Sequence, residues 1–86
     1  MIIFLYYDRT EIDGSVLEQK IQEISVSVYR NGSNQLFVNY KGSCKSLYDN
    51  IHSIVGENNV LLLNITSDYW GYQDKELWEW LNENRP

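Results

Sequence analysis

Two short segments, residues 2–7 (IIFLYY) and 60–65 (VLLLNI), are apolar on both of the faces that a β-strand presents. Successive side chains of a strand point to opposite sides of the sheet, so a strand that is packed on one side alternates apolar and polar residues. These two segments do not alternate in that way. The sequence therefore predicts two strands in a sheet whose two faces are both covered, which limits the folds open to a short chain.

Two helices are predicted between these strands. Asp13 or Ser15 can cap the first helix, and three apolar residues follow at helical spacing: Leu17, Ile21 and Ile24. Ser43 can cap the second helix, and Gly56 stands where a glycine commonly ends one. The apolar face of this second helix consists of Leu47, Tyr48, Ile51, Ile54 and Val55. Both patterns indicate amphipathic helices with one buried stripe.

A hairpin and a last helix complete the pattern. Residues 25–30 and 35–41 alternate on either side of an Asn-Gly pair, which is typical of a β-hairpin. After the strand at 59–65, residues 66–73 are predicted to form a loop, and Asp74 is predicted to cap a helix over residues 74–84. The predicted order is β-α-β-β-α-β with an extra C-terminal helix.

This order predicts an α+β, ferredoxin-like fold, in which an antiparallel sheet carries its helices on one face and the first and third strands are central. With 86 residues, of which 43% are hydrophobic, residues 1–86 suit a single domain. The second face of the sheet would be covered by a second subunit or by the last helix, through Leu77, Trp78 and Leu81.

Trp78 and Trp80 point to opposite sides of the last helix, so one of them is expected to be exposed in the monomer. Exposed tryptophans commonly mark interfaces. We therefore expect a homodimer that forms through the open sheet face, the edge of the fourth strand or the C-terminal helix, with Trp80 as a binding residue.

Charge and cysteine content narrow the classes of function. Twelve acidic residues against seven basic ones give a formal net charge of -5, and the basic residues are scattered singly along the chain. This charge disfavours general nucleic-acid binding, because neutralised phosphates supply most of that affinity. The apolar runs are shorter than the roughly 20 residues of a membrane helix, and the lone Cys44 cannot form an internal disulfide. We expect a cytoplasmic protein without a membrane span.

The connection before the last helix is chemically the most unusual segment, because it places Tyr69, Trp70 and Tyr72 around Gly71. Aromatic side chains of this kind stack on bases or dock a protein partner. The structural alternative is that Tyr69 or Trp70 folds back to cover the sheet edge. Acidic residues surround the segment, which favours a basic protein partner over an anionic one: Asp68, Asp74, Glu76, Glu79 and Glu83.

Several segments together resemble the small ferredoxin-like proteins related to the CRISPR adaptation protein Cas-two, particularly the stand-alone SinR-like members. The resemblance is carried by the strand that ends in Tyr7-Asp8, by residues 43–59 (SCKSLYDNIHSIVGENN), by VLLLNI, and by residues 69–84 (YWGYQDKELWEWLNEN). Asn59 stands where that group has an Asp before the fourth strand, and residues 9–24 are shorter than usual for it.

The resemblance implies a dimer in which Asp8 lies near its symmetry mate. In nucleolytic members this carboxylate helps to hold a divalent metal, so Asp8 is the candidate catalytic and metal-binding residue, with Mg²⁺ as the cofactor of a nuclease. The alternative is that Asp8 ends the strand and accepts hydrogen bonds in the turn. Glu11 and Asp13 are interpreted as solvated turn residues and His52 as an edge residue of the second helix, and Cys44 is assigned no role.

Three hypotheses about function follow. The preferred one is a small dimeric cytoplasmic Cas-two-like protein that acts by protein binding, as an antitoxin-like or defence-associated regulator. The second is a metal-dependent endonuclease or endoribonuclease that uses Asp8. The third is an acidic mimic of nucleic acid that inhibits a nucleic-acid-binding protein, which predicts salt-sensitive capture of a basic partner.

Overall fold

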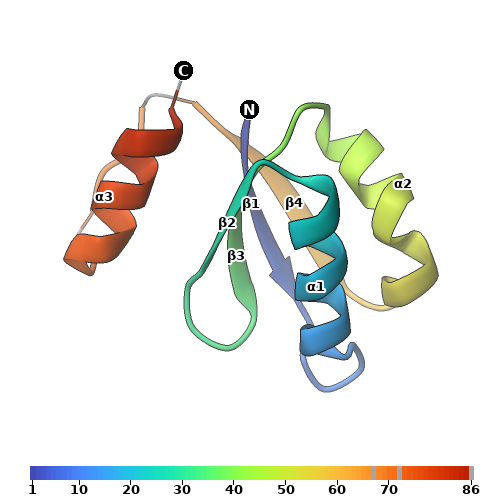
Figure 1. The fold of residues 1–86 in the computed structure, drawn as a ribbon. Helices are drawn as coiled ribbons and strands as arrows, with labels where there is room; N and C mark the ends of the chain where they lie inside the picture. Colours follow the sequence, from blue (N-terminus) through green and yellow to red (C-terminus); the bar gives the residue numbers. More distant parts are fainter. Residues whose placement is uncertain (67, 72, 86) are drawn as a thin grey trace.

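The computed structural model describes residues 1–66, 68–71 and 73–85, and it has the order of elements that the sequence predicts (Figure 1). Within these residues the fold is mixed α+β, with a four-stranded antiparallel sheet and three helices. Its elements are β1 (Ile2–Tyr7), α1 (Gly14–Ile24), β2 (Ser27–Arg30), β3 (Gln35–Asn39), α2 (Cys44–Val55), β4 (Val60–Ile65) and α3 (Lys75–Asn84).

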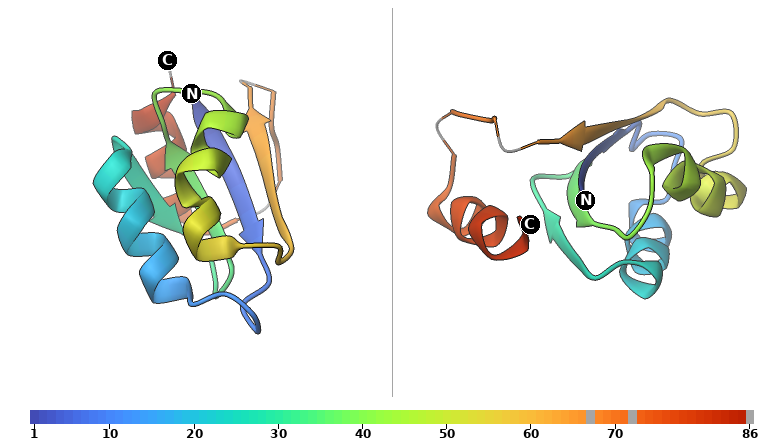
Figure 2. Two further views of the ribbon diagram at one scale, coloured as in Figure 1. Left: turned by 90° about the vertical axis from the view of Figure 1, so that its right-hand side faces the viewer. Right: turned by 90° about the horizontal axis from the view of Figure 1, so that it is seen from above.

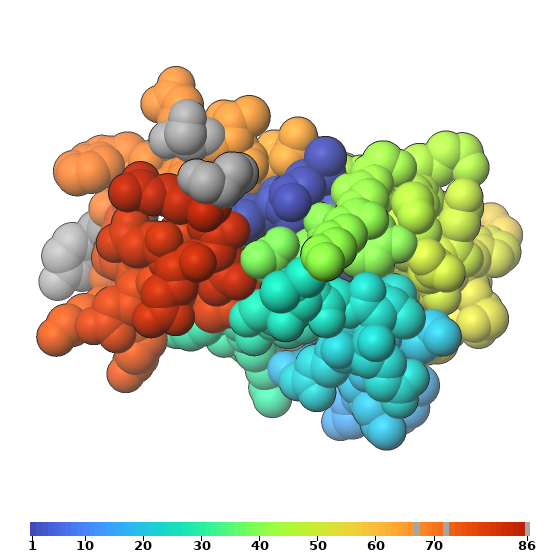
Figure 3. Space-filling view, turned by 45° about the horizontal axis from the view of Figure 1, so that its top comes forward, coloured from blue at the N-terminus to red at the C-terminus, as the bar shows by residue number. Residues whose placement is uncertain are grey.

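The strands lie in the order β2-β3-β1-β4, and each neighbouring pair is antiparallel. The prediction that the first and third strands are central is therefore confirmed. Helices α1 and α2 cover one face of this sheet, whereas α3 packs on the opposite face (Figure 2). In the space-filling view of Figure 3, α3 forms one end of the molecule and α1 and α2 form the other, with the start of β1 between them.

The larger core lies between the sheet and helices α1 and α2. The odd-numbered residues of β1 point into it, because side chains alternate along a strand, and both helices contribute their predicted apolar stripes. Nine side chains here are almost completely shielded from solvent: Ile3, Leu5, Leu17, Ile21, Leu36, Val38, Leu47, Ile51 and Val55. The sequence-based assignment of these two helix faces is confirmed.

A smaller core joins α3 to the second face of the sheet. Leu77 and Leu81 of α3 are buried against Ile2 of β1 and Phe37 of β3. A helix with its side chains is about 10 Å wide, whereas strands lie about 4.8 Å apart, so one helix covers roughly two strands. Because Trp80 of α3 packs on Tyr29 of β2 and Phe37 of β3, the smaller core lies towards β3 and the sheet edge formed by β2.

Local chemistry sets most of the element boundaries. The Asp13 carboxylate accepts hydrogen bonds from Ser15 N and Val16 N, and Ser43 Oγ accepts one from Ser46 N, so both predicted caps are present. Gly56 ends α2 with a φ of 58°, a conformation that glycine adopts without strain. Asp74 occupies the N-cap position of α3, although its side chain caps no N–H group of the described helix.

The predicted hairpin is present, but β2 is shorter than expected. It begins at Ser27 instead of at residue 25, because Ser25 Oγ donates a hydrogen bond back to Ile21 O and so closes the end of α1. The connection to β3 contains Gly32 at a φ of 80°, and Asn31 N donates to Gln35 O at 2.8 Å.

Candidate functional site

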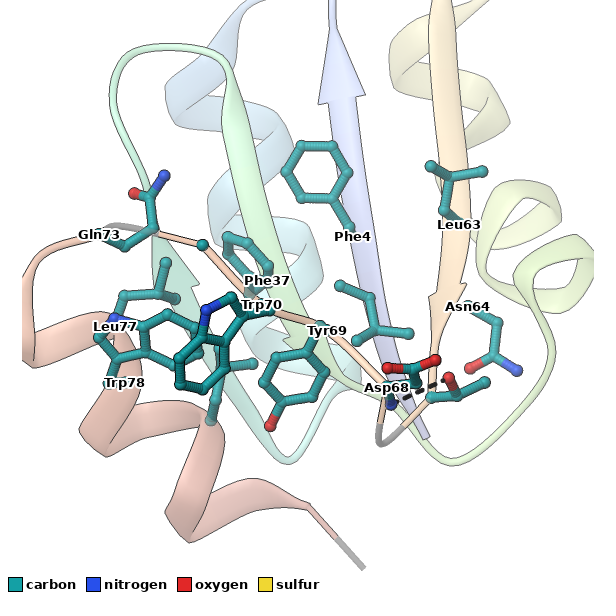
Figure 4. Close-up of a pocket in the computed structure, with 14 residues that line it drawn as sticks. Phe4, Phe37, Leu63, Asn64, Asp68, Tyr69, Trp70, Gln73, Leu77 and Trp78 are labelled. Carbon is teal, nitrogen blue, oxygen red and sulfur yellow. Dashed lines mark hydrogen bonds between the residues drawn. The ribbon is translucent and has the colours of Figure 1, made fainter.

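The second face of the sheet contains a hollow of about 440 Å³ between β1, β4, α3 and the connection that precedes α3. We call it the aromatic groove and define it by six of the side chains that line it, which are Phe4, Phe37, Leu63, Tyr69, Trp70 and Trp78. Figure 4 shows Tyr69, Trp70 and Trp78 grouped on the α3 side, while Phe4 and Leu63 project from the sheet across the hollow.

One wall of the aromatic groove is built from stacked aromatic rings. Tyr69 stacks on Trp78 with ring centroids 6.1 Å apart and an interplanar angle of 20°. Trp70 lies 6.0 Å from Trp78 at 46°, yet it remains 95% exposed. Tyr69 thus folds back onto α3, whereas the structural interpretation of the sequence placed it over the sheet edge, and Trp70 keeps nearly its whole indole in solvent. Tyr72, the third predicted binding aromatic, lies outside the described residues.

The floor of the aromatic groove is the part of the sheet that α3 leaves open. Phe4 and Phe37 pack with centroids 5.1 Å apart, and Leu63 pairs with Phe4 across the β1–β4 ladder. Leu63 is 49% exposed, and on the same face Leu61 is 54% and Tyr6 is 44% exposed. Of the two predicted covers, α3 therefore leaves the second face of β4 open, where leucines are exposed to solvent in the single chain, and cover by a second subunit stays a prediction.

Trp80 is not the exposed residue that the helix pattern predicts. It is half-buried, its Nε1 donates a hydrogen bond to Ser27 Oγ at 2.8 Å, and its ring lies 6.3 Å from Tyr29 and 6.5 Å from Phe37. Trp78 is also half-buried, so the expectation of one exposed tryptophan on α3 is wrong. The indole of Trp80 packs against the sheet, and the indole of Trp78 packs against Tyr69 and Trp70 of the connection before α3.

The charge around α3 is mainly negative. Asp68 lines the aromatic groove, and α3 carries Glu76, Glu79 and Glu83, with an exposed pair in which Lys75 Nζ lies 3.7 Å from Glu79 Oε1. Burial raises the pKa of the Tyr29 phenol, and the nearby carboxylates of Glu76 and Asp74 raise it further.

Asp8 lies at the opposite end of β1 from the aromatic groove, where it organises a turn. Its Oδ1 accepts hydrogen bonds from Thr10 Oγ1 at 2.6 Å and from Thr10 N at 3.0 Å, and these two bonds lower the pKa of the carboxyl. Its backbone N donates to Asn59 O at 3.0 Å. Among the described residues, no group of three or more His, Cys, Asp and Glu side chains gathers as a metal site would require.

The remaining candidates have local surroundings. His52 is exposed, with Nε2 3.7 Å from Glu57 Oε1 and its ring edge-on to Tyr48, in agreement with its interpretation as an edge residue. Cys44 is a half-buried free cysteine in the first turn of α2. None of the helices in the described ranges has both the length and the apolarity to cross a bilayer.

Sequence reasoning identified Tyr69 and Trp70 but missed the floor of the aromatic groove. Phe4 and Leu63 belong to the two strands that are apolar on both faces, and that pattern was interpreted as burial alone. The available signal was that a single helix follows the fourth strand, because one helix about 10 Å wide cannot cover four strands that lie about 4.8 Å apart. No family model matches this sequence, and no curated protein or solved structure matches it either.

Proposed function

We propose that the protein acts by binding a protein partner, and that its aromatic groove holds an apolar or aromatic side chain of a basic peptide segment. The observation that carries this proposal is the indole of Trp70, 95% exposed beside a hollow of about 440 Å³ whose floor includes the half-exposed Leu63. Large exposed apolar side chains around a concavity are typical of binding sites, because their burial by a ligand is favourable.

The negative charge of the chain favours a positively charged partner. At a net charge of -5, with Asp68 in the groove and three glutamates on α3, the protein attracts basic segments and repels acidic ones. A ligand that places an apolar side chain between Leu63 and Trp70 and a Lys or Arg near Asp68 would satisfy both features. Tyr69 stays in the wall of the groove, whereas Trp80 is reassigned from binding to holding α3 on the sheet.

The strand order supports a more specific proposal. Two β-α-β units joined at a hairpin, with β1 and β3 in the centre, fit the ferredoxin-like arrangement that the resemblance to Cas-two-like and SinR-like proteins implies. On this basis the protein is a homodimeric cytoplasmic regulator of the antitoxin-like or defence-associated kind. Because one fold supports many activities, the groove and not the fold carries the functional argument.

The two other hypotheses have less support from the site. A magnesium-dependent nuclease depends on Asp8, which organises a turn through Thr10 and does not gather with two further His, Cys, Asp or Glu side chains among the described residues. An acidic mimic would bind through its charge alone, so salt would abolish binding whatever residue stands at position 70. Binding through the aromatic groove depends on apolar burial and keeps much of its strength as salt rises.

Selection from a display library of random linear peptides against the purified protein tests the proposal. We expect enriched peptides to combine Trp, Phe or Leu with Lys or Arg. Trp70→Ala is expected to weaken the best peptide by about tenfold or more, the loss of a typical aromatic anchor. Val16→Ala, which removes a 48% exposed apolar side chain from α1, is the matched control and should leave binding unchanged.

Two results would overturn the proposal. One is enrichment of acidic peptides, which contradicts the charge argument. The other is peptide binding that Trp70→Ala leaves intact, which would place the binding site outside the aromatic groove.

A further inference from the structure

We propose that β4 pairs with β4 of a second copy of the chain, antiparallel and with Leu62 opposite Leu62 of the partner subunit. Two four-stranded sheets then become one continuous sheet of eight strands. This inference rests on the homodimer of the proposed function and assigns its interface, but it does not depend on what the aromatic groove binds.

The outer edge of β4 is free to pair. In the part of the chain that the structure describes, β4 is the last strand of the sheet and pairs only with β1. The bond from Asp8 N to Asn59 O fixes the alternation of the ladder, so the backbone groups of Leu61 and Leu63 point to β1. Those of Val60, Leu62 and Asn64 point outward. Within residues 1–66, 68–71 and 73–85, no strand hydrogen-bonds to this outer edge.

The two edges of the sheet are treated differently by the sequence. The β2 edge is four residues long, ends in the charged Arg30, and has Ser27 bonded to Trp80. β4 is six residues long and contains no charge and no proline, and the uncharged stretch extends over residues 58–67. Proteins protect an edge that must not pair with short strands, charges or proline. β2 has such protection, and β4 lacks all three devices.

The proposed register follows from the exposed side chains. With Leu62 at the twofold axis, Leu61 of each chain lies opposite Leu63 of the other. These two Leu61–Leu63 pairs are non-hydrogen-bonded pairs, in which cross-strand side chains are closest. These leucines are 54% and 49% exposed in the single chain. A shift by one pair in one direction would set Leu61 against Ile65 of the partner subunit, a position already packed into the smaller core. A shift in the other direction would set Leu63 against Asn59 of the partner subunit, a polar residue outside β4.

Charge also favours a second copy at this edge. Each chain carries a net charge of -5, so two copies repel each other over most of their surface. The uncharged edge of β4 is a place where they can approach with little local repulsion. Because salt screens the remaining long-range repulsion, the dimer is expected to strengthen as ionic strength rises.

The geometry has a consequence for the aromatic groove. A twofold axis between antiparallel strands is perpendicular to the sheet, so corresponding faces stay on the same side. Both grooves of the dimer then open on one face, joined by the leucines at 61 and 63 of the two chains. A partner with two basic, apolar segments would bind both grooves at once and gain from the high local concentration of the second.

Sedimentation equilibrium of the purified full chain tests the interface. We expect a mass of twice 10.2 kDa for the unaltered protein, and Leu61→Lys is expected to weaken the dimer by about tenfold or more, because a charge at an edge opposes pairing. Val16→Lys is the matched control, since it puts the same charge at a 48% exposed position on α1. A single-chain mass for the unaltered protein, or a dimer insensitive to Leu61→Lys, would overturn the proposal.

Disulfide trapping tests the register. In a Cys44→Ser background, Leu61→Cys and Leu63→Cys proteins mixed together should cross-link, because directly opposed residues in such a pair lie about 4.5 Å apart at Cα. Each protein alone should cross-link far more slowly. Efficient cross-linking of either protein alone, or none in the mixture, would overturn the register.

These outcomes are separable from those of the peptide selection. Leu61 does not line the described groove, so Leu61→Lys should break the dimer while a peptide still binds each chain. Trp70→Ala should weaken peptide binding while the dimer persists. Leu63 belongs to both surfaces, but Trp70 lines only the groove and Leu61 lies only at the β4 interface. Loss of both properties in either variant would contradict this assignment.

Discussion

The indole Nε1 of Trp80 donates a hydrogen bond to Ser27 Oγ at 2.8 Å, joining residues 53 positions apart and holding α3 against the edge strand β2. Because Trp80 also packs on Phe37 and Tyr29, its role is to attach the last helix to the sheet. We predict that Trp80→Ala lowers the free energy of unfolding by about 2–3 kcal/mol, less than for a fully buried tryptophan. Ser27→Ala should lower it by about 1 kcal/mol. Chemical denaturation followed by circular dichroism measures both.

Trp70→Ala is the matched control for that comparison. It removes the same side chain from a position that is 95% exposed, so the free energy of unfolding should change by less than about 0.5 kcal/mol. Equal destabilisation by the two tryptophan substitutions would show that the assignment of Trp80 to the core of α3 is wrong.

Gly14 lies against the Tyr7 ring, and this contact predicts a specific rescue. A Cβ at position 14 would collide with the Tyr7 hydroxyl, which donates a hydrogen bond to Ser33 O at 3.0 Å. Gly14→Ala should therefore destabilise the domain by about 1–2 kcal/mol, although alanine is the better helix former. Tyr7→Phe removes the colliding oxygen, so the double variant should be less destabilised than the sum of the singles. A strictly additive double-mutant cycle would contradict this explanation.

The parts of this fold that sequence predicts well are those set by local chemistry. Ser43, Asp13 and Gly56 act within one turn of their own helix ends, and the hairpin needs only its alternating strands and Gly32. Such features depend on neighbours in the chain, so their interpretation does not require knowledge of how α3 packs.

The parts that could not be predicted depend on how α3 packs. Helix periodicity places Trp78 and Trp80 on opposite sides of α3, but it cannot show that the sheet buries one and that Tyr69 stacks on the other. Likewise, Leu61 and Leu63 are apolar in a pattern that usually means burial, and they are exposed because one helix spans about two strands. The aromatic groove results from that partial coverage.

The hydrogen bonds from Thr10 to Asp8 predict a pH-dependent stability. They lower the folded-state pKa of the carboxyl, with the Thr10 hydroxyl contributing most. The stabilisation is therefore present above the unfolded pKa of about 4, and it is lost as the pH falls through the lower folded pKa. Titration of the Asp8 carboxyl carbon by NMR should show that Thr10→Ala raises its pKa, whereas Thr10→Ser, which keeps the hydroxyl, should change it little. An unchanged pKa in Thr10→Ala would contradict the assignment.

Asp8→Asn separates a structural role of Asp8 from a catalytic one, because the amide oxygen can still accept the bonds from Thr10 while the negative charge is removed. If the protein acts by binding, the unaltered protein should not cleave labelled RNA or DNA faster than Asp8→Asn does in magnesium or manganese. Adding a chelator should change neither result. Circular dichroism should confirm that the variant is folded. Metal-dependent cleavage that disappears in the folded variant would make Asp8 a metal ligand. It would contradict the proposed binding function and favour the nuclease hypothesis.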